Sequence, residues 1–249
     1  MSQSFGERLR AGDILRGTLL ALPSPAAAEV IAGTGFDWLF IDGEHGPFDA
    51  GSVTAVLQAV DRRLHCVVRI PRLDVGTIKQ TLDLGAAGII VPQVNTPNQA
   101  AQVVEYAKYA PLGNRGVGLA RAHDYGNDFA GYLSRANQST GVIVQAEHIE
   151  AVENIDAIAA TEGIDAVFVG PYDLSASLGH TGQLDHPEVV AAIDHITRSC
   201  QAAGMPLGIF GMSAAAVKPY MERGYTLLCA GTDVTLLAAA ARALHSELR

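Results

Sequence analysis

The sequence predicts an α/β fold, a (β/α)8 TIM barrel in which residues 1–249 form a single domain. Eight short apolar runs rich in β-branched residues alternate with alanine-rich stretches that carry helix signals. Eight strands in 249 residues leave about 31 residues for each unit, the length of a βα repeat. Buried parallel strands are continuously apolar, as these runs are. A doubly wound open sheet is the alternative arrangement.

The expected strands succeed one another along the whole chain. In order they are LLAL at 19–22, WLFI at 38–41, CVVRI at 66–70, GIIVP at 88–92, VIVQ at 142–145, AVFVG at 166–170, LGIF at 207–210 and TLLCA at 226–230. Helices are expected between them, with Ser24 and Pro25 opening AAAEVIA, Asp74 preceding VGTIKQTLDL and Asp233 preceding TLLAAAARAL. A barrel carries its catalytic residues just after the carboxyl ends of its strands, which makes those positions the candidate site.

The composition excludes several classes of partner. The chain has 17 basic and 26 acidic side chains, and its net charge of −9 repels phosphate backbones and anionic membrane surfaces. The start MSQSFGERLR is polar, and no run reaches the ~18 apolar residues of a membrane span. Three cysteines without a C-x-x-C motif favour neither a disulfide framework nor a structural zinc site. We therefore expect a cytoplasmic protein that binds neither nucleic acid nor membranes.

Polar residues gather at the ends of five consecutive strands. The segment FDWLFIDGEHGPFD at 36–49 is an apolar strand that stops abruptly and supplies three polar residues within four positions. Any one carboxylate could instead cap a helix or satisfy a loop backbone. A set that aims at one rim of the barrel predicts a functional site. Its members are Asp42, Glu44, His45, Arg69, Gln93, Gln145, Glu147 and Asp173.

Two of these residues are candidate metal ligands. Glu147 and Asp173 follow consecutive strands and are therefore expected to be neighbours on the rim. Two hard oxygen ligands with no accompanying cysteine favour Mg²⁺ or Mn²⁺ over zinc. His148 adjoins Glu147, but neighbouring strand residues point to opposite faces, so His148 is not expected to be a ligand.

His45 is the candidate general base, because an imidazole titrates close to neutral pH. Asp42 lies three residues before it and could hold its ring in one tautomer. Arg69 could hold a substrate carboxylate or stabilise an enolate oxygen with its fork of donors. The alternative for Arg69 is a salt bridge to a carboxylate of the rim.

Other mechanisms lack their signatures. A Schiff-base mechanism needs a lysine in the barrel mouth, and Lys79, Lys108 and Lys218 all fall in expected helices. The glycine-containing segments do not complete a dinucleotide fingerprint, and no Walker A sequence occurs. Carbanion chemistry, if the barrel performs it, must therefore use a metal ion.

Four segments in order, FDWLFIDGEHGP, GAAGIIVPQVNT, RGVGLARA and EGIDAVFVGPYDLSASLG, resemble the HpcH/HpaI aldolase family over nearly the whole chain. The resemblance implies a class II aldolase on a (β/α)8 barrel, dependent on a divalent ion such as Mg²⁺, Mn²⁺ or Co²⁺. Such an enzyme reversibly cleaves 4-hydroxy-2-oxo acids to an aldehyde and pyruvate, or a related acid such as hydroxypyruvate, through an enolate. It also implies a homo-oligomer, commonly a hexamer, in which subunits exchange their last helix.

The resemblance also implies a role for individual residues. Glu147 and Asp173 match the metal ligands, His45 with Asp42 an acid/base dyad, and Arg69 the group that holds the pyruvate moiety. Further contacts to substrate are expected from Gln145, Gly170, Pro171, Arg121 and Leu19, the last of which replaces a tryptophan usual in the family. Asp83 matches a catalytic-site residue, but it leads into the fourth strand on the far face and could reach only a neighbouring subunit's site.

Two alternatives remain open at this point. One is a lyase of the citrate lyase beta, malyl-CoA or phosphoenolpyruvate type, which would need a basic patch for a nucleotide or phosphate. Arg115 and Arg121 are the only basic residues of the long loop that could supply it. The other is a barrel without catalytic activity that binds a small oxo acid.

Overall fold

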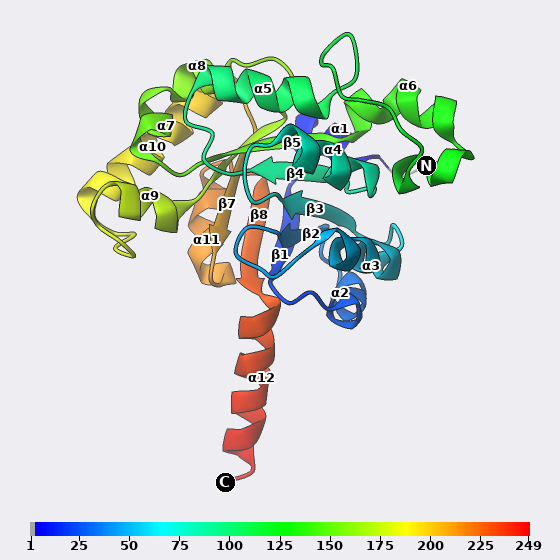
Figure 1. Ribbon diagram of the computed structural model, residues 1–249. Coiled ribbons are helices and arrows are strands. Elements are labelled where there is room, and N and C mark those ends of the chain that lie inside the picture. Colours follow the sequence, from blue (N-terminus) through cyan, green and yellow to red (C-terminus); the bar gives the residue numbers. More distant parts are fainter. Residues whose placement is uncertain (1–2) are drawn as a thin grey trace.

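The computed structural model describes residues 3–249, whose eight parallel strands close into a barrel in sequence order (Figure 1). The closed barrel confirms the predicted fold and excludes the open sheet. The strands are β1 Leu15–Leu20, β2 Trp38–Asp42, β3 His65–Arg69, β4 Gly88–Val91, β5 Gly141–Ala146, β6 Ala166–Val169, β7 Leu207–Gly211 and β8 Leu227–Thr232.

Helices surround the barrel and connect its strands. They are α1 Phe5–Arg10, α2 Pro25–Ala32, α3 Ala50–Val60, α4 Val75–Asp83, α5 Pro97–Ala107, the 3-10 helix Arg121–Gly126, α6 Phe129–Ser139, α7 Ile149–Glu153, α8 Ile155–Ala159, α9 Pro171–Ser177, α10 Pro187–Ala202, α11 Ala214–Glu222 and α12 Asp233–Glu247. Within residues 3–249, no helix combines the length and hydrophobicity needed to cross a membrane.

Local capping chemistry fixes where several helices begin. The Ser24 and Asp74 side chains accept hydrogen bonds from the first turns of α2 and α4, as the sequence predicts. The start of α12 differs from the expectation, because Thr232 is its cap. Asp233 lies inside the first turn and its carboxylate accepts the backbone N–H groups of Ala21 and Leu22. This contact ties the end of β1 to α12, and β1 itself begins four residues earlier than predicted.

Aromatic side chains fill the inside of the barrel. The Phe40 and Phe168 rings meet edge to face at 5.7 Å, and Trp38 stacks on Phe40 at 5.8 Å. The Trp38 indole N–H donates to the backbone carbonyl of Leu228 at 3.1 Å, which satisfies its one buried polar group. Because the interior is packed, the barrel is not a pore, and a ligand is expected to enter at the carboxyl ends of the strands.

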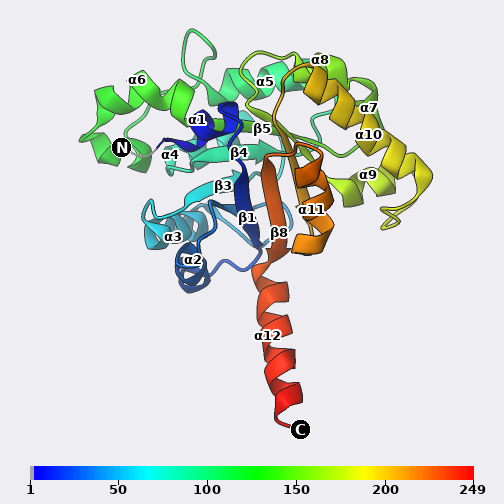
Figure 2. The same cartoon turned by 180° about the vertical axis from the view of Figure 1, so that it is seen from behind.

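The last helix, α12, is separate from the rest of the molecule. It projects away from the barrel in both views of the ribbon (Figures 1 and 2). Of its residues only Asp233 is buried. Three leucines along it, Leu236, Leu237 and Leu244, are exposed, and so is Leu248 directly after its end. Isolated helices are marginally stable, so an apolar helix in this position calls for a partner surface.

Candidate active site

A cavity of about 360 Å³ opens at the carboxyl ends of the strands. Eight of the predicted site residues line it, contributed by β1, β2, β3, β5 and the start of α9 or the loops beside them. These residues are Leu19, Asp42, His45, Arg69, Gln145, Gly170, Pro171 and Asp173. Aromatic side chains of Phe40, Phe168, Phe210 and Tyr172 complete much of the wall. The three lysines lie outside this lining, as the sequence predicts.

Arg69 is the central cation of the cavity, and two carboxylates hold it. Its Nε and Nη2 donate to the two oxygens of Asp42 at 2.9 and 2.8 Å, and its Nη1 lies 3.0 Å from Glu44 Oε2. Both Arg69 and Asp42 are buried. The salt bridge that the sequence left as an alternative is therefore present. A guanidinium has five N–H donors, so two of them stay available to a ligand.

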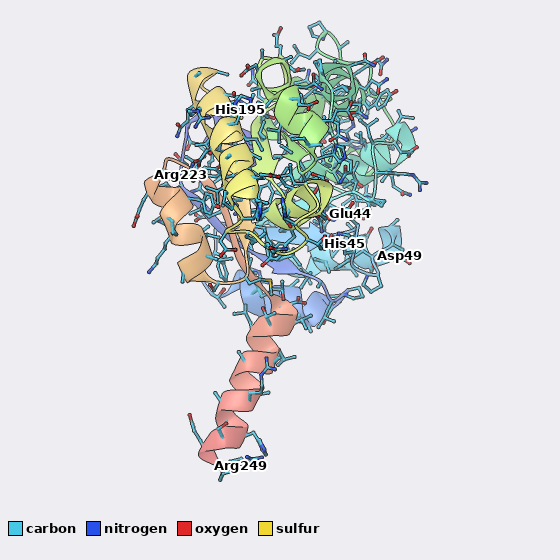
Figure 3. All side chains as sticks on the ribbon, turned by 90° about the vertical axis from the view of Figure 1, so that its left-hand side faces the viewer. Glu44, His45, Asp49, His195, Arg223 and Arg249 are labelled. Carbon is cyan, nitrogen blue, oxygen red and sulfur yellow. The ribbon has the colours of Figure 1, made fainter. Side chains whose placement is uncertain are left out.

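His45 does not contact Asp42 in the way the predicted dyad requires. The Asp42 carboxylate accepts the backbone N–H groups of Glu44 and His45 at 3.2 Å each, and no hydrogen bond to the His45 ring is found within residues 3–249. The ring is 64% exposed and its Nε2 lies 3.9 Å from Glu44 Oε2 (Figure 3). This difference arises because Asp42 caps the turn that follows β2 and is already occupied by Arg69. The carboxylate beside the imidazole is that of Glu44.

Glu147 follows β5 and has 1% of its surface exposed; it does not itself line the cavity but lies beside Gln145 and Gly170, which do. Its Oε1 accepts the backbone N–H of Gln93 at 2.8 Å, and its Oε2 contacts the amide nitrogen of Gln145. Gly170 makes room for it, since a Cβ there would lie 2.7 Å from Glu147 Oε2. Gln93 has φ of 54°, an unusual backbone that turns its N–H toward the carboxylate. These contacts hold one face of Glu147 and fix its orientation.

The electrostatics of the site favour a bound cation. Burial above all, helped by the nearby charges of Asp173 and Glu44, raises the pKa of Glu147 to about 7, although the Gln93 N–H and Arg69 oppose the shift. Burial likewise raises the pKa of Glu44, with Asp42 and Asp173 adding to the effect against Arg69 and His45. Arg69 cannot neutralise all of these carboxylates, so a divalent cation would supply the missing charge.

The donor set also fits a hard divalent ion. Glu147 and Asp173 offer carboxylate oxygens, which Mg²⁺ and Mn²⁺ prefer. The buried Oε1 of Gln145 has no hydrogen-bond partner. A cation that keeps some of its waters would give this oxygen a donor. The residues present therefore suit such an ion at this position.

Two predicted site residues lie elsewhere in the molecule. Arg121 donates to the backbone carbonyls of Leu84 and Leu57 at 3.0 and 3.1 Å and lines a separate cavity at the amino-terminal ends of the strands. Asp83, the last residue of α4, accepts a 2.6 Å hydrogen bond from Arg115. Neither Arg121 nor Asp83 therefore lines the mouth of its own barrel, so a contact of either residue with substrate stays a prediction that needs a neighbouring subunit.

The sequence pointed to Glu44 and Gln93 as strand-end residues without giving either a role. Glu44 links Arg69 to the His45 ring, and the Gln93 backbone orients Glu147. The clustering of polar residues after β2 was the available signal for Glu44. Gln93 acts through its backbone N–H and a left-handed φ, for which the residue type gives no signal.

The fold and this cavity define a (β/α)8-barrel enzyme with a carboxylate-rich site at the ends of its strands. The family model of the HpcH/HpaI aldolase/citrate lyase family matches residues 17–240, and the chain belongs to that family. Its relatives include a hydroxypyruvate/pyruvate aldolase of Deinococcus radiodurans, 46% identical with 100% of this chain and 91% of that protein covered. A 4-hydroxy-2-oxovalerate aldolase of Rhodococcus jostii is 44% identical, with 98% and 95% covered.

A solved structure is closely similar over its full length. It is an HpcH/HpaI aldolase/citrate lyase family protein from Burkholderia cenocepacia, with a TM-score of 0.95, 39% sequence identity and 100% of both chains covered. Together with the full-length relatives named as aldolases, this makes the chain an aldolase, a carbon–carbon lyase.

Proposed function

We propose that this aldolase depends on a divalent metal ion and reversibly cleaves 4-hydroxy-2-oxo acids to an aldehyde and pyruvate, or the related hydroxypyruvate. The observation that carries the proposal is the carboxylate set around Glu147, which is short of positive charge and sits beside an arginine with two free donors. The names of the relatives support the donor class, since one is a hydroxypyruvate/pyruvate aldolase and another a 4-hydroxy-2-oxovalerate aldolase.

Glu147 and Asp173 are the proposed ligands of the ion, with Mg²⁺ or Mn²⁺ preferred and Co²⁺ a possible substitute. When bound there, the ion would polarise the carbonyl of a 2-oxo acid and so make the hydrogens of the adjacent carbon acidic. Glu147 is rigid because Gln93 and Gln145 hold it, whereas Asp173 is only partly buried at the start of α9. The pair thus combines one fixed ligand with one that can adjust.

Arg69 binds the oxo acid in this proposal. Its two uncommitted N–H groups can donate to the substrate carboxylate and to the keto oxygen, where negative charge grows as the adjacent carbon loses its proton. Asp42 and Glu44 keep the guanidinium in one orientation. Gln145, Gly170 and Pro171 line the same cavity and would help to confine the small ligand.

His45 is the proposed base, acting directly or through a water molecule. It lines the cavity, and the partly buried Glu44 beside its ring would stabilise the imidazolium that forms when it accepts a proton. In the cleavage direction the same group removes the proton of the 4-hydroxyl. Leu19 and the aromatic side chains that line the cavity would give the aldehyde an apolar surface to bind against.

A CoA or phosphate handle has little support. Arg115 is buried against Tyr109 and paired with Asp83, and Arg121 is bound to backbone carbonyls. The basic patch that such a substrate needs is therefore not formed by the two residues able to supply it. A small oxo acid and a small aldehyde fit the 360 Å³ cavity better.

We also propose that the chain forms a homo-oligomer, a hexamer, with α12 exchanged between subunits. The exposed leucines of a helix that leaves its own barrel support this arrangement. Asp83 and Arg121 can reach substrate only in the mouth of a neighbouring subunit. Light scattering tests the exchange, since Leu237→Glu should dissociate the assembly.

A cytoplasmic location is proposed because Cys66, Cys200 and Cys229 are buried free thiols.

The proposed reaction is tested with a panel of aldehydes and two donors. The purified protein with Mg²⁺ or Mn²⁺ is incubated with pyruvate or hydroxypyruvate, and the 4-hydroxy-2-oxo acid formed is measured by chromatography and mass spectrometry. Adduct formation that stops on chelation is expected. No adduct with either donor and any aldehyde of the panel would refute the proposed substrate class.

A further inference from the structure

The loop that joins α9 to α10 brings together three side chains with metal-ligating atoms. Among residues 3–249, His180, His186 and Glu188 form the one group of three His, Cys, Asp or Glu side chains whose ligand atoms all lie within 4.8 Å of one another. None of them lines the mouth cavity. We propose that this trio is a second metal site, distinct from the carboxylate site in the mouth, and that it takes a nitrogen-preferring ion of the zinc class.

The ligand atoms of the trio lie close enough together for one ion to reach them. All three lie within 4.8 Å of one another, and His180 Nε2 lies 3.0 Å from Glu188 Oε2. Two ligand atoms bonded to one tetrahedral zinc are about 3.3 Å apart, because each bond is about 2.0–2.1 Å long. The His180 and His186 rings stack nearly parallel, at 20° and with centroids 3.4 Å apart, so both imidazoles must rotate to direct a nitrogen lone pair at the same ion.

The backbone of the loop holds both histidines before any ion arrives. The His180 N–H donates to the Ser175 carbonyl at 2.8 Å, and the Gly182 N–H donates to the Ser175 hydroxyl at 2.9 Å. The Gln183 N–H donates to the His180 carbonyl, and the His186 N–H to that of Gln183. His186 is also the cap of α10, so its position is tied to the helix that carries Glu188. Little chain entropy remains to be lost on binding.

The ligand types distinguish this site from the mouth. Two imidazoles with one carboxylate suit Zn²⁺, Ni²⁺, Cu²⁺ or Co²⁺, whereas the all-oxygen set in the mouth suits Mg²⁺ or Mn²⁺. An ion held by three protein ligands keeps a position for water, as the partial exposure of the trio allows. The ion would fasten the loop to the start of α10 and thereby restrain α9, whose first turn carries Asp173.

The test isolates the loop site by disabling the mouth. Zn²⁺ is titrated calorimetrically into full-length Glu147→Gln protein, and Co²⁺ is added separately while its visible absorption is recorded. The same measurements are made on double variants that combine Glu147→Gln with His180→Ala or with His186→Asn. Asparagine is chosen at residue 186 because it can still cap α10. His195→Ala is the matched control, since His195 lies on α10 (Figure 3). It is nine residues after His186, about 14 Å along the helix axis.

One equivalent of Zn²⁺ and a Co²⁺ spectrum of tetrahedral type are expected for Glu147→Gln. His180→Ala and His186→Asn should each weaken Zn²⁺ binding at least about tenfold and abolish that spectrum. His195→Ala should change neither. Circular dichroism confirms that each variant is folded. Absence of zinc binding in Glu147→Gln would overturn the proposal. Zinc binding that stays equally tight in His180→Ala would also overturn it and leave an adventitious ion only. Neither outcome bears on the aldolase reaction.

Discussion

The guanidinium of Arg69 and the carboxylate of Asp42 form a two-point hydrogen-bonded pair at the mouth of the barrel, at 2.9 and 2.8 Å. The parallel register of β2 and β3 places the two residues directly opposite each other, so the pair follows from strand alignment. Truncating Arg69 would leave Asp42 as a buried carboxylate without a charged partner, at a cost of about 3–5 kcal/mol. The pair therefore holds the guanidinium in one orientation and still leaves N–H donors of Arg69 for a ligand.

Replacing that arginine tests its geometry separately from its charge. Arg69→Lys keeps a cation beside Asp42 but loses the planar fork, so substrate cannot be held at two points. We expect kcat/KM for cleavage to fall about 100- to 1000-fold while the protein remains folded. Arg135→Lys is the control, because Arg135 is half exposed on α6 and its salt bridge is to Asp128, away from the cavity. Equal activity of Arg69→Lys and the wild type would contradict the role of the fork.

The histidine at the cavity is tested by a change that preserves size and removes the base. His45→Asn is expected to lower kcat about 100- to 10,000-fold with little change in affinity for the metal ion. Steady-state kinetics and Mn²⁺ binding measured together separate the two effects. His148→Asn is the matched control, since His148 adjoins Glu147 but does not line the cavity, and its Nδ1 accepts the backbone N–H of Glu150. A comparable loss in both variants would refute the specific role of His45.

The raised pKa of Glu147 predicts how the metal-free protein responds to pH. The folded pKa is about 7 and the usual value is 4.5, so between these values the folded state holds a proton that the unfolded state has lost. Stability should therefore fall as pH rises from about 4.5 to 7, by on the order of 3 kcal/mol from this group alone. Urea unfolding of chelator-treated protein measures the slope.

A matched pair of variants isolates that contribution. Glu147→Gln removes the titrating group, so its unfolding free energy should decline less over this range and exceed that of wild type above pH 7. Glu153→Gln, at an exposed position of α7, should follow the wild type. An unchanged slope in Glu147→Gln would show that Glu147 is not the group responsible.

The space that Gly170 leaves for Glu147 can be tested by filling it. A Cβ at Gly170 would lie 2.7 Å from Glu147 Oε2 and 2.8 Å from Gln145 Nε2, so Gly170→Ala must displace the proposed ligand. We expect Mn²⁺ affinity, followed by electron paramagnetic resonance, to drop at least about tenfold. In Gly51→Ala the new Cβ meets nothing closer than 3.5 Å, and affinity should stay constant. Undiminished binding in Gly170→Ala would place the ion elsewhere.

The fold was predictable because its signal is local and repeated. Each buried parallel strand had to be apolar, and strand ends had to carry the polar residues, so Asp42, Arg69, Glu147 and Asp173 could be proposed as candidate site residues from position alone. Which of these residues contact one another could not be predicted. The group that Asp42 contacts depends on the β2–β3 register and on the turn that Asp42 caps, and residue types reveal neither.

The positions of several other residues could not be predicted from the sequence, because they depend on how loops fold. Arg121 follows a long irregular segment, and a loop position does not say which end of the barrel its side chain reaches. His180 and His186 meet only because hydrogen bonds from Ser175 and within the loop fold the chain back. Gln93 contributes a backbone N–H, so its side chain offered no signal for that contact.

The exchange of the methyl hydrogens of pyruvate into deuterated water, followed by proton NMR, tests the central claim most directly, because it needs the proposed ion and base but no aldehyde. Exchange is predicted for wild type with Mg²⁺ or Mn²⁺, with loss after chelation and in Glu147→Gln, and retention in Glu153→Gln. Exchange at an undiminished rate in chelated protein, or in Glu147→Gln, would contradict the account.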